Sequence, residues 1–137
     1  MASQHGGFRV GHGYDLHRLV EGRPLVLAGL VVPFDRGPFG HSDGDVLCHA
    51  LVDAIFGAAS AGDIGRHFPN TDPAWKDAPG LDLLARGVAI VRGLGWRVVN
   101  VDVTILLERP KLAPVIDELR ARLAPVLGVD VNAVSVK

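Results

Sequence analysis

Residues 41–50 read HSDGDVLCHA, a polar run that passes directly into an apolar one. Ser42 followed three residues later by Asp45 has the spacing of a capping box, so a helix is predicted over roughly Asp45 to Ala59. His49 lies four residues from both Asp45 and Asp53, on a shared face of that helix. A histidine between two carboxylates is typical of a metal ligand with supporting acids. A histidine at the edge of the core, satisfied by its acidic neighbours, would give the same pattern.

A second set of candidate ligands lies in GHGYDLH, residues 11–17. The pattern from Phe8 to Val20 is that of a strand, in which the glycines at 11 and 13 indicate a bulge or close approach of another backbone. Asp15 and His17 are two residues apart, so both side chains leave the same strand face. With His49 they would make two histidines and one carboxylate, the donor set of a catalytic zinc site with an open fourth position. Exposed polar residues on an edge strand are the alternative.

The rest of the chain predicts an α+β fold, a mixed β-sheet with helices packed on one face. Residues 60–79 form a long connection without a clear period, which in compact domains is usually either functional or disordered. The last strand, helix and strand make a βαβ unit with parallel strands. The other predicted elements are a strand over 24–32, a loop over 33–40, a helix over 81–94, a strand over 96–107, a helix from Pro114 to Pro125 or Gly128, and a strand over 129–137.

Length and composition predict one domain over residues 1–137, with Met1–Gly7 as a disordered leader. The net charge of −1 indicates no nucleic-acid partner, and no apolar run approaches the roughly 20 residues of a membrane span. Cys48 is the single cysteine, which excludes an internal disulfide and is typical of a cytoplasmic protein. The strongly apolar second strand and the valine-rich strand face suggest an oligomer.

Several polar residues outside the metal set could bind substrate. His41 and Ser42 precede the predicted helix, whose free N–H groups favour a phosphate, and His41 could donate a hydrogen bond to it. Asp63 lies between glycines and could accept from substrate hydroxyls, whereas residues 70–72 are better explained as turn formers. Arg109 and Lys111 follow the strand over 96–107 and are phosphate candidates, although a solvated basic pair is the commoner explanation.

Six motifs in order resemble the 2-C-methyl-D-erythritol 2,4-cyclodiphosphate synthase family. The resemblance runs from Arg9 to Lys137, and its second motif alone is highly specific. The motifs are GHGYDLH (11–17), HSDGDVLCHA (41–50), GDIG (62–65), FPNTDP (68–73), NVDVTI (100–105) and RPKL (109–112).

The resemblance implies a homotrimer with ferredoxin-like βαβ elements and active sites between subunits. It implies that Asp15, His17 and His49 bind Zn2+ or another divalent transition metal, that Mg2+ or Mn2+ bridges the substrate diphosphate, and that His41 stabilises the transition state. The substrate is 4-diphosphocytidyl-2-C-methyl-D-erythritol 2-phosphate, a cytidine diphosphate compound, and CMP is released. Implied substrate contacts are Asp15, His17, His41 and Ser42; Asp63, Ile64, Gly65, Phe68, Pro69, Asn70, Thr71 and Asp72 around methylerythritol; and Leu107, Glu108, Arg109, Pro110, Lys111, Leu112 and Ala113 around cytidine.

Members of that family continue past the equivalent of Lys137 with an Ala-Thr-Thr-x-Glu loop and a last apolar segment. That loop carries a phosphate-contacting threonine and a glutamate that helps to hold the second ion. We expect such a segment to follow Lys137, and an intact mass near 14.5 kDa would contradict this. Two other functions stay open at this point: a zinc hydrolase, which would need a general base beside the metal, and a non-catalytic trimeric metal-binding module.

Overall fold

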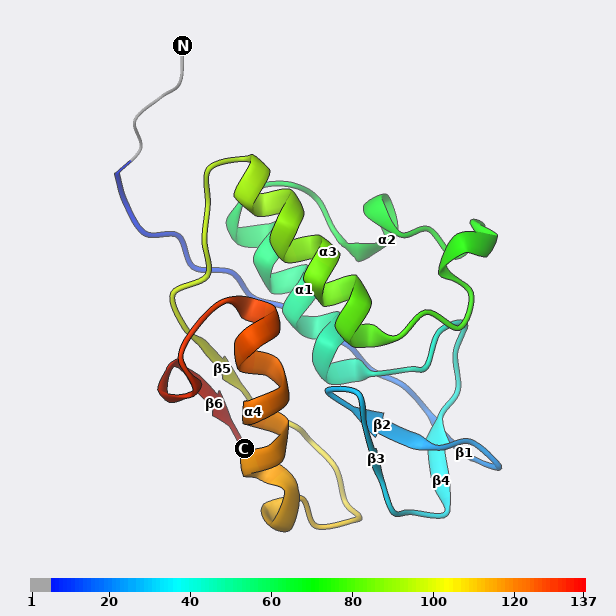
Figure 1. Cartoon of the computed structure of the whole chain (residues 1–137). Helices are drawn as coiled ribbons and strands as arrows, with labels where there is room; N and C mark the ends of the chain where they lie inside the picture. Colours follow the sequence, from blue (N-terminus) through cyan, green and yellow to red (C-terminus); the bar gives the residue numbers. More distant parts are fainter. Residues whose placement is uncertain (1–5) are drawn as a thin grey trace.

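Helix α1 (Val46–Ala58) lies at the centre of the fold and packs along helix α3 (Gly80–Gly93). The computed structural model describes residues 6–137, so most of the predicted leader lies outside the described residues. Both helices match their predicted spans to within a residue at each end. Figure 1 shows α1 and α3 side by side, with the strands β1 to β4 at one end and α4, β5 and β6 beside them.

The start of α1 is set by Asp45. Its carboxylate accepts a hydrogen bond from the backbone N–H of Cys48 at 3.1 Å, which is the contact of a helix N-cap. The predicted capping box is therefore wrong, because Asp45 is the cap residue itself and Ser42 lies three residues before it. Gly44, at φ +72°, turns the chain between them. The predicted apolar stripe (Val46, Leu47, Ala50, Leu51, Ala54 and Ile55) is only partly right, because Leu47, Leu51 and Ile55 are buried whereas the other three are half-buried. The buried face is turned by about one residue and also contains Cys48, His49, Val52 and Phe56.

The predicted strand over 24–32 is a hairpin instead. β2 (Leu25–Leu27) pairs antiparallel with β3 (Leu30–Val32), and Ala28 and Gly29 turn the chain at φ 49° and 72°. Positive φ at both central residues is the geometry of the tightest hairpin turns. The predicted loop over 33–40 is also partly wrong, because β4 (Arg36–Pro38) pairs antiparallel with β1 (Leu19–Glu21).

The C-terminal βαβ unit is confirmed. β5 (Val101–Val103) and β6 (Val134–Val136) are parallel, and α4 (Ile116–Leu127) lies between them in sequence. Gly128 ends α4 in the left-handed conformation, at φ 73°, as one of the two predicted stops. Pro125 does not end it, because a proline in the last turn removes only one backbone hydrogen bond. Two short 3-10 helices lie within this unit, η2 (Ala113–Val115) before α4 and η3 (Val131–Ala133) after it.

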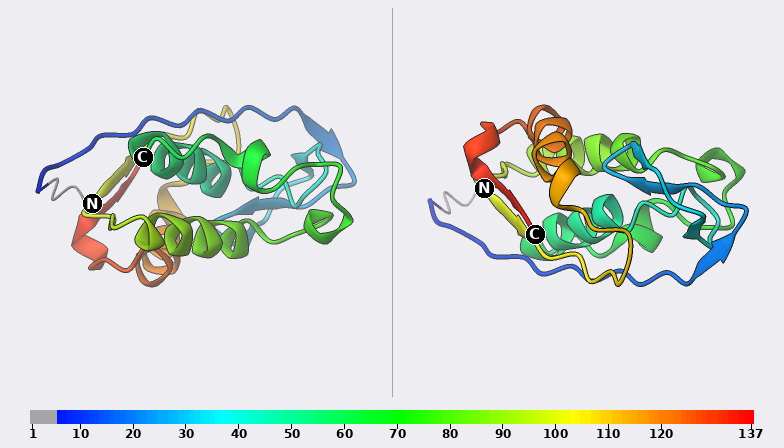
Figure 2. Two further views of the ribbon diagram at one scale, coloured as in Figure 1. Left: turned by 90° about the horizontal axis from the view of Figure 1, so that it is seen from above. Right: turned by 90° about the horizontal axis from the view of Figure 1, so that it is seen from below.

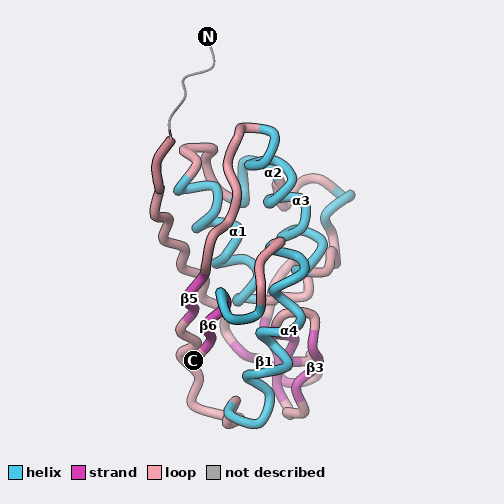
Figure 3. The backbone as a smooth tube through the Cα atoms, turned by 60° about the vertical axis from the view of Figure 1, so that its left-hand side comes forward, coloured by secondary structure: helices cyan, strands magenta, loops and turns pink. Residues whose placement is uncertain are grey.

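Residues 8–17 are extended and run along α1 in the opposite direction, rather than pairing in a sheet (Figures 2 and 3). A Cβ added at Gly11 would lie 1.8 Å from the carbonyl oxygen of Ala54, and one added at Gly13 would lie 1.8 Å from that of Ala50. The glycines therefore allow the close backbone approach predicted for them. Within residues 6–137 the six strands form three two-stranded sheets, so the α+β class is confirmed and the single mixed sheet is wrong.

The connection over 60–79 is built from two short helical segments, α2 (Ile64–His67) and η1 (Pro73–Trp75). Asp63 and Asp72 cap them, accepting from the backbone N–H groups of Arg66 and Ala74. None of the helices over the described residues is long and apolar enough to cross a membrane. The connection is thus an ordered arm beside α1 and α3.

Candidate functional site

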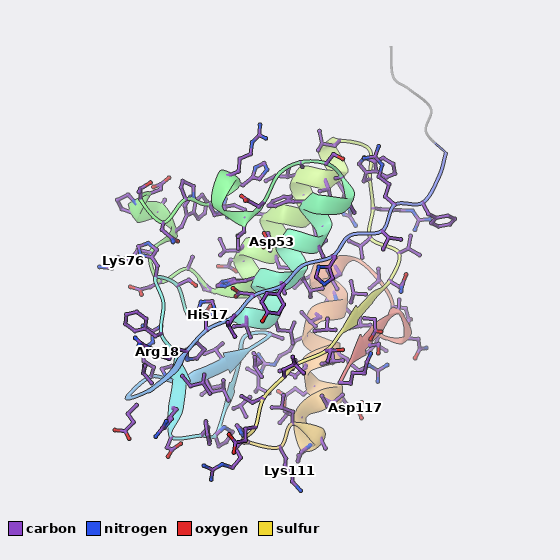
Figure 4. The ribbon with its side chains drawn as sticks, turned by 180° about the vertical axis from the view of Figure 1, so that it is seen from behind. His17, Arg18, Asp53, Lys76, Lys111 and Asp117 are labelled. Atoms are coloured by element: carbon purple, nitrogen blue, oxygen red, sulfur yellow. The ribbon has the colours of Figure 1, made fainter. Side chains whose placement is uncertain are left out.

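Asp15, His17 and His49 come together where the extended segment reaches the N-terminal part of α1. The Asp15 Oδ2 atom lies 3.1 Å from His17 Nδ1 and 3.3 Å from His49 Nδ1. Asp15 Oδ2 and His17 Nδ1 are both buried, and neither makes a hydrogen bond. His17 is seen beside the extended segment in Figure 4. Three polar atoms thus face one another in a space from which water is largely excluded.

The spacing of these atoms fits a small metal ion. Zinc bonds to nitrogen and oxygen are about 2.0–2.2 Å long, so two ligands of one tetrahedral ion lie about 3.3–3.6 Å apart. The 3.3 Å distance from Asp15 Oδ2 to His49 Nδ1 falls in that range, and the 3.1 Å distance to His17 Nδ1 is slightly shorter. The ligand atoms of all three residues lie within 4.8 Å of one another. Two nitrogens and one carboxylate oxygen are donors that zinc and similar divalent metals accept. The orphaned buried atoms therefore have the arrangement that a bound cation would satisfy.

The surroundings of His49 differ from the prediction. The carboxylate of Asp45 accepts from the backbone N–H groups of Ala28, Gly29 and Cys48, and that of Asp53 accepts from Ile64. Neither acid therefore makes a hydrogen bond to the His49 ring. Its Nε2 atom lies 3.2 Å from Ser42 Oγ instead, a contact that the helical pattern did not indicate.

The charges around His49 favour its cationic form in the metal-free protein. Burial lowers the pKa of His49, but the nearby carboxylates of Asp15, Asp45 and Asp43 together raise that pKa above its usual value. A divalent cation in the same place would meet the same negative potential. The cluster is therefore electrostatically suited to positive charge.

The loop that carries His41 and Ser42 is held from two sides. The Arg23 guanidinium donates to the carbonyl oxygens of Gly40 and Ser42, and the N–H of Asp77 donates to the carbonyl of His41. The Nε2 atom of His41 is buried and makes no hydrogen bond. Sequence reasoning missed Arg23, since an arginine in a turn gives no sign of the distant backbone it contacts.

The other predicted substrate contacts are spread over the arm. Asp63 uses one carboxylate oxygen as the cap of α2, and Asp72 does the same for η1, which confirms the turn-forming role expected of residues 70–72. Phe68 is a core residue, 7% exposed, with its ring 5.0 Å from that of Trp75. Its side chain therefore packs into the core, where its ring also lies 6.2 Å from that of Phe56 in α1.

The residues of the segment Leu107–Ala113, except Arg109, line a hollow of about 320 Å³. A smaller hollow, of about 80 Å³, lies between residues 15–19 and 105–107 and includes Asp15 and His17 in its wall. Ile105 and Leu107 line both hollows, so the larger hollow adjoins the one beside Asp15 and His17. The larger hollow is lined by Ile105, Leu107, Glu108, Pro110, Lys111, Leu112, Ala113, Ile116 and Lys137.

Comparison with known proteins agrees with this arrangement. The YgbB family model matches residues 8–137. A 2-C-methyl-D-erythritol 2,4-cyclodiphosphate synthase of Chromobacterium violaceum is 58% identical over 95% of this chain and 82% of its own length.

Solved structures agree as well. A 2C-methyl-D-erythritol-2,4-cyclodiphosphate synthase in a CDP-bound form is 38% identical, covers 93% of this chain and 85% of its own, and has a TM-score of 0.89. The bifunctional IspDF of Campylobacter jejuni is 39% identical over 96% of this chain and 36% of its own, with a TM-score of 0.91. The chain therefore belongs to the YgbB family, that of the 2-C-methyl-D-erythritol 2,4-cyclodiphosphate synthases.

Proposed function

We propose that this chain converts 4-diphosphocytidyl-2-C-methyl-D-erythritol 2-phosphate into 2-C-methyl-D-erythritol 2,4-cyclodiphosphate and CMP, a step of non-mevalonate isoprenoid biosynthesis. The observation that carries the proposal is the cluster of Asp15, His17 and His49 beside the His41–Ser42 loop. It stands in a fold shared with a CDP-bound synthase. A metal-ligand set next to a phosphate-facing loop is what a phosphoryl transfer requires.

The reaction needs no nucleophilic side chain, because the substrate supplies its own nucleophile. An oxygen of the 2-phosphate attacks the β-phosphorus in line, the new P–O bond closes the ring, and the bond to the CMP phosphate breaks. Both reacting groups are anions, so the site must neutralise their repulsion and hold them in line. A zinc-type ion held by Asp15, His17 and His49 would supply that positive charge at a phosphate oxygen.

The protein side chains then orient and stabilise the reacting groups. His41, whose Nε2 atom is buried and without a hydrogen bond, would donate to a phosphoryl oxygen as negative charge accumulates there. Ser42 contacts the same phosphate. Asp63 to Gly65 and Phe68 to Asp72 border the methylerythritol group, and Leu107 to Ala113 border cytidine. A second ion, Mg2+ or Mn2+, would bridge the diphosphate largely through phosphate oxygens.

The exposed side of the extended segment supports a homotrimer with active sites between neighbouring subunits. Phe8, Val10 and Leu16 are 88%, 94% and 76% exposed, and Leu106 is 87% exposed. A row of large apolar side chains of this kind is typical of a surface covered by another subunit. Light scattering should give three times the chain mass, and Val10→Glu should lower it by placing a charge in the interface. A wild-type chain that is monomeric at assay concentration would contradict the trimer.

A cytoplasmic setting is part of the same proposal. Cys48, the single cysteine, is fully buried in the core and unpaired, which suits a reducing compartment.

Incubation with the cytidylyl substrate, Zn2+ and Mg2+ tests the activity directly. Release of CMP together with a cyclic diphosphate, detected by phosphorus NMR, is the expected result. A product carrying an oxygen from labelled water would indicate a hydrolase instead. No reaction in a zinc-loaded, folded protein that includes the segment expected after Lys137 would indicate a metal-binding module and would overturn the proposal.

A further inference from the structure

Ser42 makes two contacts that together set its role. Its Oγ atom accepts a hydrogen bond from the backbone N–H of Gly44 at 3.2 Å, within its own loop. The same atom lies 3.2 Å from the Nε2 atom of His49, in the first turns of α1. Ser42 thus connects the loop to the histidine of the ligand cluster.

The direction of the second hydrogen bond follows from a count of protons. A serine hydroxyl has one proton and two lone pairs, whereas a neutral imidazole has one N–H and one bare nitrogen. The Nδ1 atom of His49 faces Asp15 Oδ2 at 3.3 Å, on the side of the ligand cluster. An Nδ1 atom that binds a cation cannot carry a proton, so the ring proton must be on Nε2 and is donated to Ser42 Oγ.

We propose that Ser42 is a positioning residue for His49: it accepts the Nε2 proton, and so fixes the tautomer and ring orientation that present Nδ1 to the ion. This inference rests on the proposed function. Both lone pairs of Ser42 Oγ are then occupied, one by Gly44 and one by His49. The hydroxyl proton is left to be donated to a substrate phosphoryl oxygen. The same oxygen would therefore link the ion site to the reacting phosphate.

The two acidic side chains expected beside His49 do not contact its Nε2 atom. Asp53 is on the expected helix face, but its carboxylate accepts from Ile64 at 2.8 Å. Asp45 is fully buried and accepts from three backbone N–H groups. Ser42 alone, within the described residues, has a hydrogen-bonding atom in contact with Nε2 of His49.

Zinc affinity, measured by competition with a chromophoric chelator, tests the inference without an activity assay. Loss of a partner that supports a metal ligand lowers affinity about 10- to 100-fold, so Ser42→Ala should weaken zinc binding by that factor. Ser42→Thr keeps the hydroxyl and should restore binding to within about threefold. Asp53→Asn is the matched control, because an amide oxygen can still accept from Ile64, and it should leave the affinity unchanged.

His49→Ala separates failure of the inference from failure of the site. If His49→Ala loses zinc but Ser42→Ala binds as the wild type does, the ion site stands and the role of Ser42 is overturned. If His49→Ala retains zinc, both are overturned. A loss in Asp53→Asn as large as that in Ser42→Ala would also overturn the role of Ser42.

Nitrogen-15 NMR of the unsubstituted, zinc-loaded protein gives a second test that does not depend on a variant folding. The expected spectrum has His49 metal-bound at Nδ1 and protonated at Nε2. A His49 ring that binds zinc through Nε2 would overturn the inference.

Discussion

Gly13→Ala should damage the ion site without touching any of its ligands. The added Cβ would lie 1.8 Å from the Ala50 carbonyl oxygen, whereas such contacts are essentially never below 3.0 Å. The extended segment must therefore move away from α1 by at least about 1 Å, since the helix is held by the core. Asp15 is two residues farther along the segment, and metal–ligand distances tolerate only about 0.2 Å.

The expected effect is large enough to measure in two ways. Zinc affinity should fall at least about tenfold, as for other losses of ligand geometry, and unfolding free energy should fall by about 1–3 kcal/mol, the usual cost of overpacking. Chelator competition and urea unfolding of the metal-free protein give the two values. Gly7→Ala, just before the extended segment, is the control, since a Cβ there meets nothing within 4 Å. The reasoning is refuted if Gly13→Ala binds zinc as Gly7→Ala does.

Substitutions at three further positions, His49, Asp45 and Lys111, test other parts of the structure. His49→Ala should abolish bound zinc, and zinc retained after dialysis would count against the ligand assignment. Asp45→Ala should destabilise the fold by about 3 kcal/mol in urea unfolding, because it leaves three backbone N–H groups without their acceptor. Burial raises the pKa of Asp45 above its usual value of 3.8, so the folded state binds the carboxyl proton more tightly than the unfolded state does. The unfolding free energy of the wild type should therefore fall relative to that of Asp45→Asn as pH rises from 3.8 towards the raised pKa. Plots of unfolding free energy against pH that run parallel for the two proteins would contradict this. Lys111→Ala should weaken CDP binding about fivefold by calorimetry, the loss of roughly 1 kcal/mol, whereas the exposed Arg97→Ala should not.

Local pattern predicted the long helices well and the strands poorly. The helices α1 and α3 follow an apolar period that only a helix satisfies, and Gly128 marks the end of α4. The stretch over 24–32 is apolar throughout, so no alternation marks the turn at Ala28–Gly29. Residues 8–17 alternate as a strand does, yet in the described chain they lie against α1 without a partner strand. Strand pairing depends on distant residues, which a local pattern does not contain.

The ligand types of the candidate site could also be predicted, but its contacts could not. Asp15, His17 and His49 were expected from their spacing, and the structure brings them together. The acids four residues from His49 were expected to support it, and each is used by backbone N–H groups instead. Helical spacing shows which residues share a face, but not which of them a neighbouring segment has already engaged.

By itself, the sequence determined where the main helices begin and end and which side chains could bind a metal, because these depend on residues close together in the chain. Tertiary structure decided that the extended segment runs along α1, packed against it at two glycines, which brings Asp15 and His17 to His49. It also decided that Ser42, rather than Asp45 or Asp53, meets the far side of the His49 ring. Residues 41–50 therefore supply both a metal ligand and the group that orients it, because the loop folds back over the first turn of its own helix.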